Sequence, residues 1–227
     1  MLRDFLHLAY PHLCCACNKP LYKYEKLICT YCKYHLPKTN FHFEDDNPVI
    51  RQFWGKANVF SATAFYYFSK GGRVQQLLHN LKYNGKKEVG IEVGKMFGKE
   101  LKESPLYNTV NCVIPVPLHL SKKKKRGYNQ SDFIADGIAE GMGIPSEKEV
   151  LIRATATSTQ TKKSAFERWL NVESIFKLKN ENQISGKHIL LVDDVITTGS
   201  TFESCAAALL SVPGTRVSIA AIAVAKK

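Results

Sequence analysis

The stretch that decides the fold is residues 189–201, which read ILLVDDVITTGST. Its first four residues are apolar and fit a strand that is buried on both faces, as in a parallel sheet. Two adjacent carboxylates, Asp193 and Asp194, follow this strand. Because open α/β sheets bind ligands at the carboxyl ends of their strands, we expect a ligand site directly after residue 192.

The end of this stretch, TTGST, is suited to a phosphate group. Hydroxyls, a glycine and the start of a predicted helix follow one another within one turn. Hydroxyls and the backbone N–H groups at a helix N-terminus bind phosphate, and glycine lets the backbone approach it closely. With two carboxylates beside it to accept hydrogen bonds from hydroxyls, the stretch predicts a ribose 5-phosphate site. The residues expected to hold the phosphate are Thr197, Thr198, Gly199, Ser200 and Thr201.

The remainder of residues 57–227 alternates strands with amphipathic helices. Apolar runs predict strands at 59–68, 112–114, 150–153, 188–192 and 217–224. Helical spacing of apolar residues predicts helices at 74–81, 89–101, 131–142 and 202–210. This alternation implies an α/β fold in which helices cover a parallel sheet.

Four cysteines near the N-terminus indicate a separate metal-binding module. Cys14 and Cys17 form one C-x-x-C pair, and Cys29 and Cys32 form a second. This spacing lets four thiolates surround one structural zinc ion, although an iron–sulfur cluster uses the same ligands, and free thiols or two disulfides stay open as well. Residues 37–56 mix prolines, a glycine and an acidic run without periodicity, so we interpret them as a linker. The predicted units are therefore residues 1–56 and 57–227.

A basic segment follows the predicted strand at 112–114. Pro115 and Val116 lead into the run of Lys122 to Arg126, which carries five adjacent positive charges. We expect this run to be solvated and mobile until an anion binds. At the end of a second strand, such a loop is placed to stabilise a pyrophosphate with its magnesium ion. A surface tract or a nucleic-acid contact is the alternative.

The net charge of +12, from 32 Lys and Arg against 20 Asp and Glu, favours an anionic partner. Nucleic acid, an acidic membrane face and a phosphorylated small molecule all fit this charge. No apolar run approaches the roughly 20 residues of a transmembrane helix, and Asp4, His7 and Pro11 interrupt the N-terminal apolar residues. We therefore expect a cytoplasmic protein with no transmembrane segment.

Over nearly the whole chain the sequence resembles the ComF family, the competence-associated branch of the type I phosphoribosyltransferases. Residues 189–201 look like the phosphoribosyl-pyrophosphate (PRPP) motif of these enzymes. The other shared features are the four-cysteine finger, the VPLH loop at 116–119, the RGYNQ segment at 126–130 and the later Arg153, Gln160, Arg168, Asn171 and Phe176. The resemblance implies a type I phosphoribosyltransferase-like sheet behind a small zinc module.

The resemblance also implies roles for the site residues. Asp193 and Asp194 would hold the 2′ and 3′ hydroxyls of the ribose, residues 197–201 the 5′-phosphate, and the loop that begins at Pro115 and Val116 the pyrophosphate. Lys125 and Arg126 are the candidate cations that assist its departure. We thus expect a magnesium-dependent phosphoribosyltransferase with an unknown acceptor and a link to DNA uptake. The alternatives are a non-catalytic protein that binds single-stranded DNA and a regulator that senses PRPP.

Overall fold

The computed structural model describes residues 11–153 and 175–225, and its core is a four-stranded parallel sheet in the order β1-β6-β5-β2. The strands are β1 (Ser61–Phe68), β2 (Cys112–Pro115), β5 (His188–Ile196) and β6 (Arg216–Ala225). The expected α/β class is therefore confirmed. The observed starts of these four strands lie within two residues of the expected starts. Strand β5 is longer than expected, because it continues to Ile196 and not only to residue 192.

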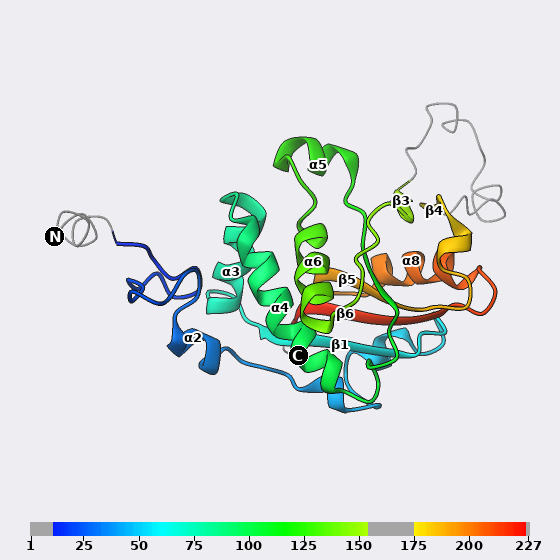
Figure 1. The fold of residues 1–227 in the computed structure, drawn as a ribbon, viewed down its shortest axis with the longest axis horizontal. Helices are drawn as coiled ribbons and strands as arrows, with labels where there is room; N and C mark the ends of the chain where they lie inside the picture. The colour runs from blue at the N-terminus through cyan, green and yellow to red at the C-terminus, as the bar shows by residue number, and fades with distance from the viewer. Residues whose placement is uncertain (1–10, 154–174, 226–227) are drawn as a thin grey trace.

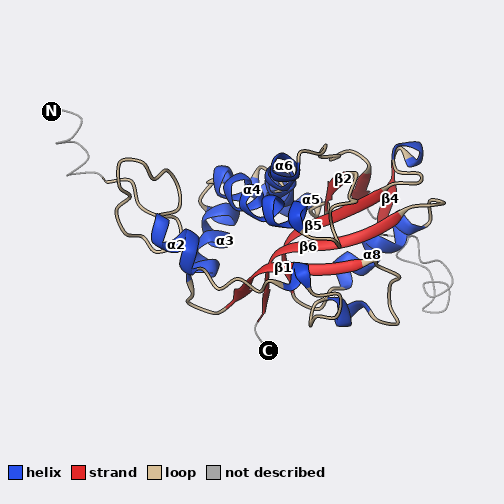
Figure 2. Cartoon of the chain, turned by 60° about the horizontal axis from the view of Figure 1, so that its bottom comes forward, coloured by secondary structure: helices blue, strands red, loops and turns tan. Residues whose placement is uncertain are grey.

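Helices cover both faces of this sheet, as Figure 2 shows. One face carries α3 (Arg73–Tyr83), α4 (Lys87–Glu103) and α6 (Gln130–Met142), and the other carries α8 (Ser200–Leu210). Alternate residues of β5 enter the two cores: Leu190 and Val192 pack toward α4 and α6, whereas Ile189 and Leu191 pack toward α8. Four consecutive apolar residues are thus explained by burial on both faces.

Glycines allow α4 and α6 to pack in close contact. They are Gly94 and Gly98 on α4, and Gly137 and Gly141 on α6. A Cβ atom at any of these four positions would lie less than 3.0 Å from a backbone oxygen of the facing helix. Since the crowding atoms belong to the backbone, a small rotamer change in a neighbouring side chain would not relieve the steric overlap.

The N-terminal module lies beside α3, away from the sheet (Figure 1). It contains the short helix α2 (Thr30–His35), and its buried cysteines belong to the same apolar cluster as Leu77 and Leu81 of α3. The contacts across this boundary include an ion pair of Lys33 with Glu92 of α4 at 2.6 Å, and Arg73 lies over the Tyr31 ring at 5.0 Å.

The stretch interpreted as a linker does not have the exposure expected of one. It forms two 3-10 turns, η1 (Phe41–Phe43) and η2 (Ile50–Phe53). Phe41, Val49, Ile50 and Phe53 are buried in the core on the α8 face. The interpretation was wrong because short 3-10 turns leave no apolar periodicity in a sequence.

Two further segments differ from expectation. The basic run forms a helix, α5 (Leu120–Arg126), that protrudes above α6 in Figure 1. The strand expected at 150–153, β3 (Leu151–Arg153), lies outside the main sheet and pairs antiparallel with β4 (Phe176–Leu178). Another 3-10 turn, η4 (Glu181–Gln183), precedes β5. Within residues 11–153 and 175–225, no helix has the length and apolar character of a membrane span.

Candidate functional site

The carboxyl ends of β2 and β5 lie side by side, because these strands are parallel neighbours and Pro115 is in register with Val192. The Val116 N–H donates to the Val192 carbonyl at 2.8 Å and holds the two following loops together. From β2 the chain continues through α6 to a bridge between Ser146 and Val113, on the outer side of β2. From β5 it continues through α8 to β6, on the other side. The two strand ends therefore flank a topological switch point, where open α/β sheets bind ligands.

A cleft of about 710 Å³ opens at this point. Its walls come from the end of α3, the loop after β2, α5, β3 and the end of β5. Five basic side chains line it together with the two carboxylates. The residues that line it include Lys82, Tyr83, Val116, Lys122, Lys125, Arg126, Arg153, Asp193, Asp194 and Thr201. The cleft thus combines a cationic wall with an acidic floor.

The two carboxylates are held by different partners. Asp193 Oδ1 accepts hydrogen bonds from the Ser131 hydroxyl at 2.6 Å and from the Asp194 N–H at 2.8 Å. Asp194, which is buried, forms an ion pair with Lys82 at 2.9 Å between Oδ2 and Nζ. Neither Lys82 nor Ser131 was expected from the sequence, because each is far from residue 193 in the chain and no motif marks it.

The protonation of Asp193 responds to its surroundings. Burial and the neighbouring charge of Asp194 together raise the pKa of Asp193 to about 7, against the lowering effect of the Ser131 hydroxyl. Burial and the adjacent carboxylate therefore disfavour the ionised form of Asp193 in the ligand-free site. A ligand that donates hydroxyl hydrogens to the pair would favour its ionised form.

The loop after β5 forms a small hollow of about 40 Å³ beside the cleft. Thr197, Thr198, Gly199, Ser200 and Thr201 all line it, and Asp193 and Thr201 line the cleft as well. The first N–H groups of α8 have no intrahelical acceptor, and the helix dipole makes this end positive. The loop therefore offers hydroxyl and backbone donors to one anion.

Gly199 is needed for the shape of this loop. Its φ of 81° lies in the left-handed region, and a Cβ atom there would be 3.1 Å from the Phe53 ring. Phe53, which belongs to the stretch interpreted as a linker, therefore packs closely against this loop.

Helix α5 presents one basic face to the cleft. Lys122, Lys125 and Arg126 line the cleft, and their i, i+3, i+4 spacing puts them on one side of the helix. Lys123 and Lys124 lie on the remaining surface and are exposed. Arg126 donates to the Gln130 side chain and lies over the Tyr83 ring at 5.4 Å.

Most of the residues singled out in the sequence meet at this point. Asp193, Asp194, Lys125 and Arg126 line one cleft, and Val116, directly after β2, lines it as well. Pro115 is buried as the last residue of β2 and is not one of the residues that line the cleft. Of the later residues in the ComF pattern, Arg153 lines the cleft, whereas Gln160, Arg168 and Asn171 lie outside the described residues.

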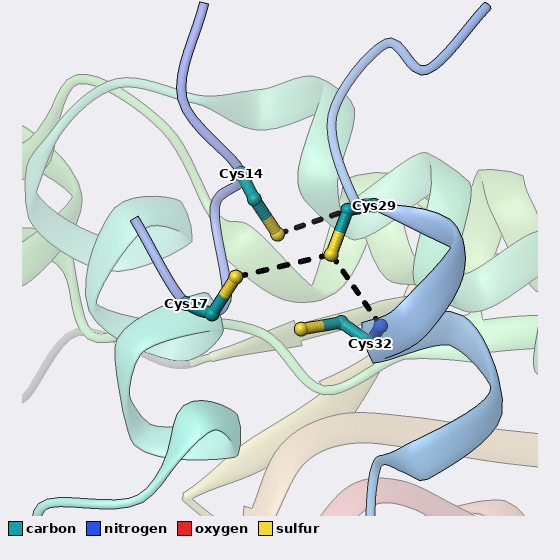
Figure 3. A group of neighbouring side chains, drawn as sticks. All are labelled: Cys14, Cys17, Cys29 and Cys32. Atoms are coloured by element: carbon teal, nitrogen blue, oxygen red, sulfur yellow. Dashed lines mark hydrogen bonds between the residues drawn. The ribbon is translucent and has the colours of Figure 1, made fainter. Parts of the chain in front are cut away.

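The four paired cysteines form a second candidate site. In Figure 3 their sulfur atoms face a common centre, and all four lie within 4.8 Å of one another. Cys17 Sγ and Cys29 Sγ are 3.8 Å apart. Tetrahedral thiolates around zinc are also about 3.8 Å apart, because the Zn–S bond measures about 2.3 Å. The geometry therefore fits a four-thiolate metal site.

Backbone donors favour the thiolate form of one cysteine in this cluster, Cys14. Cys14 Sγ accepts from the N–H groups of Cys29 at 3.3 Å and of Ala16 at 3.4 Å. Burial by itself would raise the pKa of Cys14, but these donors outweigh it and lower the pKa to about 7. Burial raises the pKa of the Cys29 and Cys32 thiols, as it does for Cys15. Cys15 is distinguished from the four by position, because it is buried outside the cluster.

Comparison with known proteins points to one family. Residues 113–227 match the model of the phosphoribosyl transferase domain, which is more than half of the chain. "DNA utilization protein YhgH" of Salmonella typhimurium is 32% identical over 137 residues, which are 59% of this chain and 60% of that protein. The match thus covers less than two thirds of the Salmonella protein.

A second relative covers more of the chain. "Competence protein F" of Haemophilus influenzae is 25% identical over 205 residues, which are 88% of this chain and 84% of that protein. Among solved structures, an allosteric regulatory enzyme of purine biosynthesis is 24% identical with a TM-score of 0.43, over 62% of this chain and 29% of that one.

Proposed function

The chain belongs to the phosphoribosyl transferase domain family, and from this premise we propose that it binds PRPP and transfers the phosphoribosyl group to an acceptor. The observation that carries the proposal is the meeting of two loops at the switch point of the sheet. One loop offers carboxylates and a small hollow with hydroxyl donors, and the other offers a cationic wall. PRPP has the matching groups: ribose hydroxyls, one phosphate and a pyrophosphate.

Each group of PRPP has a candidate partner. Asp193 and Asp194 accept hydrogen bonds from the ribose hydroxyls, and residues 197–201 bind the 5-phosphate. Lys122, Lys125 and Arg126 bind the pyrophosphate. A magnesium ion that accompanies PRPP would supply further positive charge at the pyrophosphate oxygens.

The transfer reaction follows from this placement. A lone pair of the acceptor forms a bond to C1 of the ribose while the bond from C1 to the pyrophosphate oxygen breaks. The pyrophosphate leaves with the electrons of that bond, and positive charge develops on the ribose ring. Lys125 and Arg126 stabilise the charge on the leaving group, and the nearby carboxylates favour the cationic ring.

We expect this transfer to release pyrophosphate only when an acceptor is present. The test incubates the protein with PRPP, magnesium and a panel of nitrogenous bases and amines. Arg126→Ala should lower the rate about 100-fold with any acceptor that reacts, because the variant lacks a preorganised positive charge that stabilises the leaving pyrophosphate. Lys148→Ala removes a cation that pairs with Asp136 outside the cleft, so this control should keep the wild-type rate. Binding of PRPP without release for any acceptor would instead favour the PRPP sensor.

We further propose that the four cysteines bind one structural zinc ion. Freshly purified protein should contain one zinc per chain by elemental analysis, and Cys29→Ser should lose it. The free energy of metal binding stabilises small modules of this kind, so residues 11–36 should unfold in this variant while the sheet stays folded. Cys15→Ser is the matched control and should keep the zinc. Iron with inorganic sulfide, or no metal at all, would contradict the assignment.

Single-stranded DNA is a second candidate ligand. Lys123 and Lys124 are exposed and lie outside the cleft lining, and the relatives are named for DNA utilization and competence. If these lysines bind DNA phosphates, the logarithm of affinity should fall linearly with the logarithm of salt concentration. Replacing both by alanine should reduce this slope by about 1.4, while PRPP affinity is retained. A slope that the double variant leaves unchanged would exclude Lys123 and Lys124 as DNA contacts.

A further inference from the structure

Helix α3 connects the four-cysteine module with the cleft. Its last residues, Lys82 and Tyr83, line the cleft, and Lys82 forms the ion pair with Asp194. Two residues earlier, Asn80 is buried and faces the module. Its side-chain Nδ2 donates to the carbonyl oxygen of Cys15 at 2.8 Å.

Cys15 is held firmly on the module side of this bond. It lies between Cys14 and Cys17, two of the four clustered cysteines, and its N–H donates to the Leu27 carbonyl at 2.8 Å. A metal ion that fixes Cys14 and Cys17 would therefore also fix the carbonyl that Asn80 binds. The Lys86 ammonium makes a second contact here, 3.7 Å from Cys15 Sγ.

Asn80 also organises the turn that forms the edge of the cleft. Its backbone carbonyl accepts from the N–H groups of Asn84 at 3.2 Å and Lys86 at 3.3 Å. Its side-chain Oδ1 accepts from Asn84 Nδ2 at 3.0 Å. The turn of residues 83–86 includes Tyr83 and Gly85, which both line the cleft. The Asn80 side chain also donates to the Gln76 carbonyl of α3 at 3.1 Å, so it bonds to the module, to the turn and to the helix that carries Lys82.

We propose that the four-cysteine module is a positioning element of the PRPP site, acting through Asn80 on Lys82 and the turn of residues 83–86. The inference rests on the proposed function, because it assigns the cleft to PRPP. Lys82 then has two tasks: its charge offsets that of buried Asp194, and it keeps this carboxylate oriented toward the ribose hydroxyls. Asn80 is a positioning residue, since it touches no part of the cleft itself.

The test compares two contacts between the module and the body of the protein. Asn80→Leu removes the hydrogen bond between α3 and Cys15 of the module. Lys33→Met removes the ion pair between the module and Glu92 of α4, a helix that contributes no residue to the cleft lining. We expect Asn80→Leu to weaken binding of magnesium-loaded PRPP about 3- to 10-fold in calorimetry, and Lys33→Met to leave it unchanged. Equal affinities for Asn80→Leu and wild type, or equal losses in both variants, would overturn the proposal.

A double-mutant cycle separates positioning from a general loss of stability. If Asn80 acts through Lys82, most of its effect should disappear in a Lys82→Met background. Full additivity of the two substitutions would contradict this route. If Asn80→Leu does not fold, Lys86→Met removes the contact with Cys15 Sγ from an exposed side chain and takes its place in the titration.

Hydrogen exchange tests the inference without any ligand. In Asn80→Leu, the amides of Asn84 and Lys86 should lose protection, while those of Val93 and Phe97 in α4 keep it. Unchanged protection in the turn would overturn the coupling even if PRPP binds. Conversely, a wild-type protein that shows no affinity for PRPP would refute the proposed function. Hydrogen exchange would then still decide whether the module positions the turn of residues 83–86.

Discussion

Asp194→Asn is expected to weaken PRPP binding by roughly 10- to 150-fold. The substitution replaces a charged acceptor for a ribose hydroxyl by a neutral one, and a hydrogen bond to a charged group contributes about 1.5–3 kcal/mol. It also leaves the ammonium of Lys82 without its partner at 2.9 Å, so that this cation no longer orients the side chain at position 194.

The fold should tolerate this change. The lost ion pair with Lys82 destabilises the protein, but the loss of one of two adjacent carboxylates relieves repulsion with Asp193. These two effects oppose each other, so we expect the thermal midpoint to stay within a few degrees of wild type. Asp136→Asn is the matched control: its carboxylate pairs with Lys148 at 2.6 Å outside the cleft, and its loss should not affect PRPP binding. Equal affinity for Asp194→Asn and wild type would remove Asp194 from the site.

Gly137→Ala is expected to cause a large loss of stability. The new Cβ atom would overlap the backbone of Ile91 in α4, so the two helices would have to separate. Overpacking of this kind costs up to about 3 kcal/mol, and the better helix propensity of alanine returns about 1 kcal/mol. The net cost of about 2 kcal/mol should lower the thermal midpoint by about 4–8 °C.

Gly90→Ala provides the graded control for this prediction. Its new Cβ atom would meet Leu81 Cδ1 at 3.1 Å, which can move by side-chain rotation, and Phe133 Cβ at 3.2 Å. Relief then needs a shift of only a few tenths of an ångström, much less than at Gly137. Scanning calorimetry should therefore show a midpoint close to wild type for Gly90→Ala. An equally large drop in both variants would mean that the crowding of backbone atoms does not set the cost.

Local sequence patterns predicted the sheet and one half of the cleft. Four apolar residues, two acids and a hydroxyl-rich turn are consecutive in the chain, so residues 189–201 contain both the strand and its candidate phosphate hollow. The helices α3, α4, α6 and α8 were predicted because their apolar residues recur with helical spacing.

The partners that complete the cleft come from other parts of the chain. Lys82 and Ser131 approach the acidic pair only after α3 and α6 pack on the sheet, and no local pattern distinguishes them from other polar helix residues. Repulsion among the charges of the basic run predicts a mobile segment, but this prediction leaves out the capping of a helix at the start of the run. The structure gives it a helix with His119 as its N-cap, which accepts from the Ser121 N–H at 3.2 Å.

The most direct test of the PRPP site is a calorimetric titration of the wild-type protein with PRPP and with ribose 5-phosphate, each with and without magnesium. Both ligands offer the phosphate and the ribose hydroxyls, but only PRPP carries the pyrophosphate that chelates magnesium and faces the cationic wall. We expect PRPP to bind more tightly than ribose 5-phosphate, and magnesium to strengthen PRPP binding far more than ribose 5-phosphate binding. Equal affinities for the two ligands, or no effect of magnesium on PRPP, would contradict it.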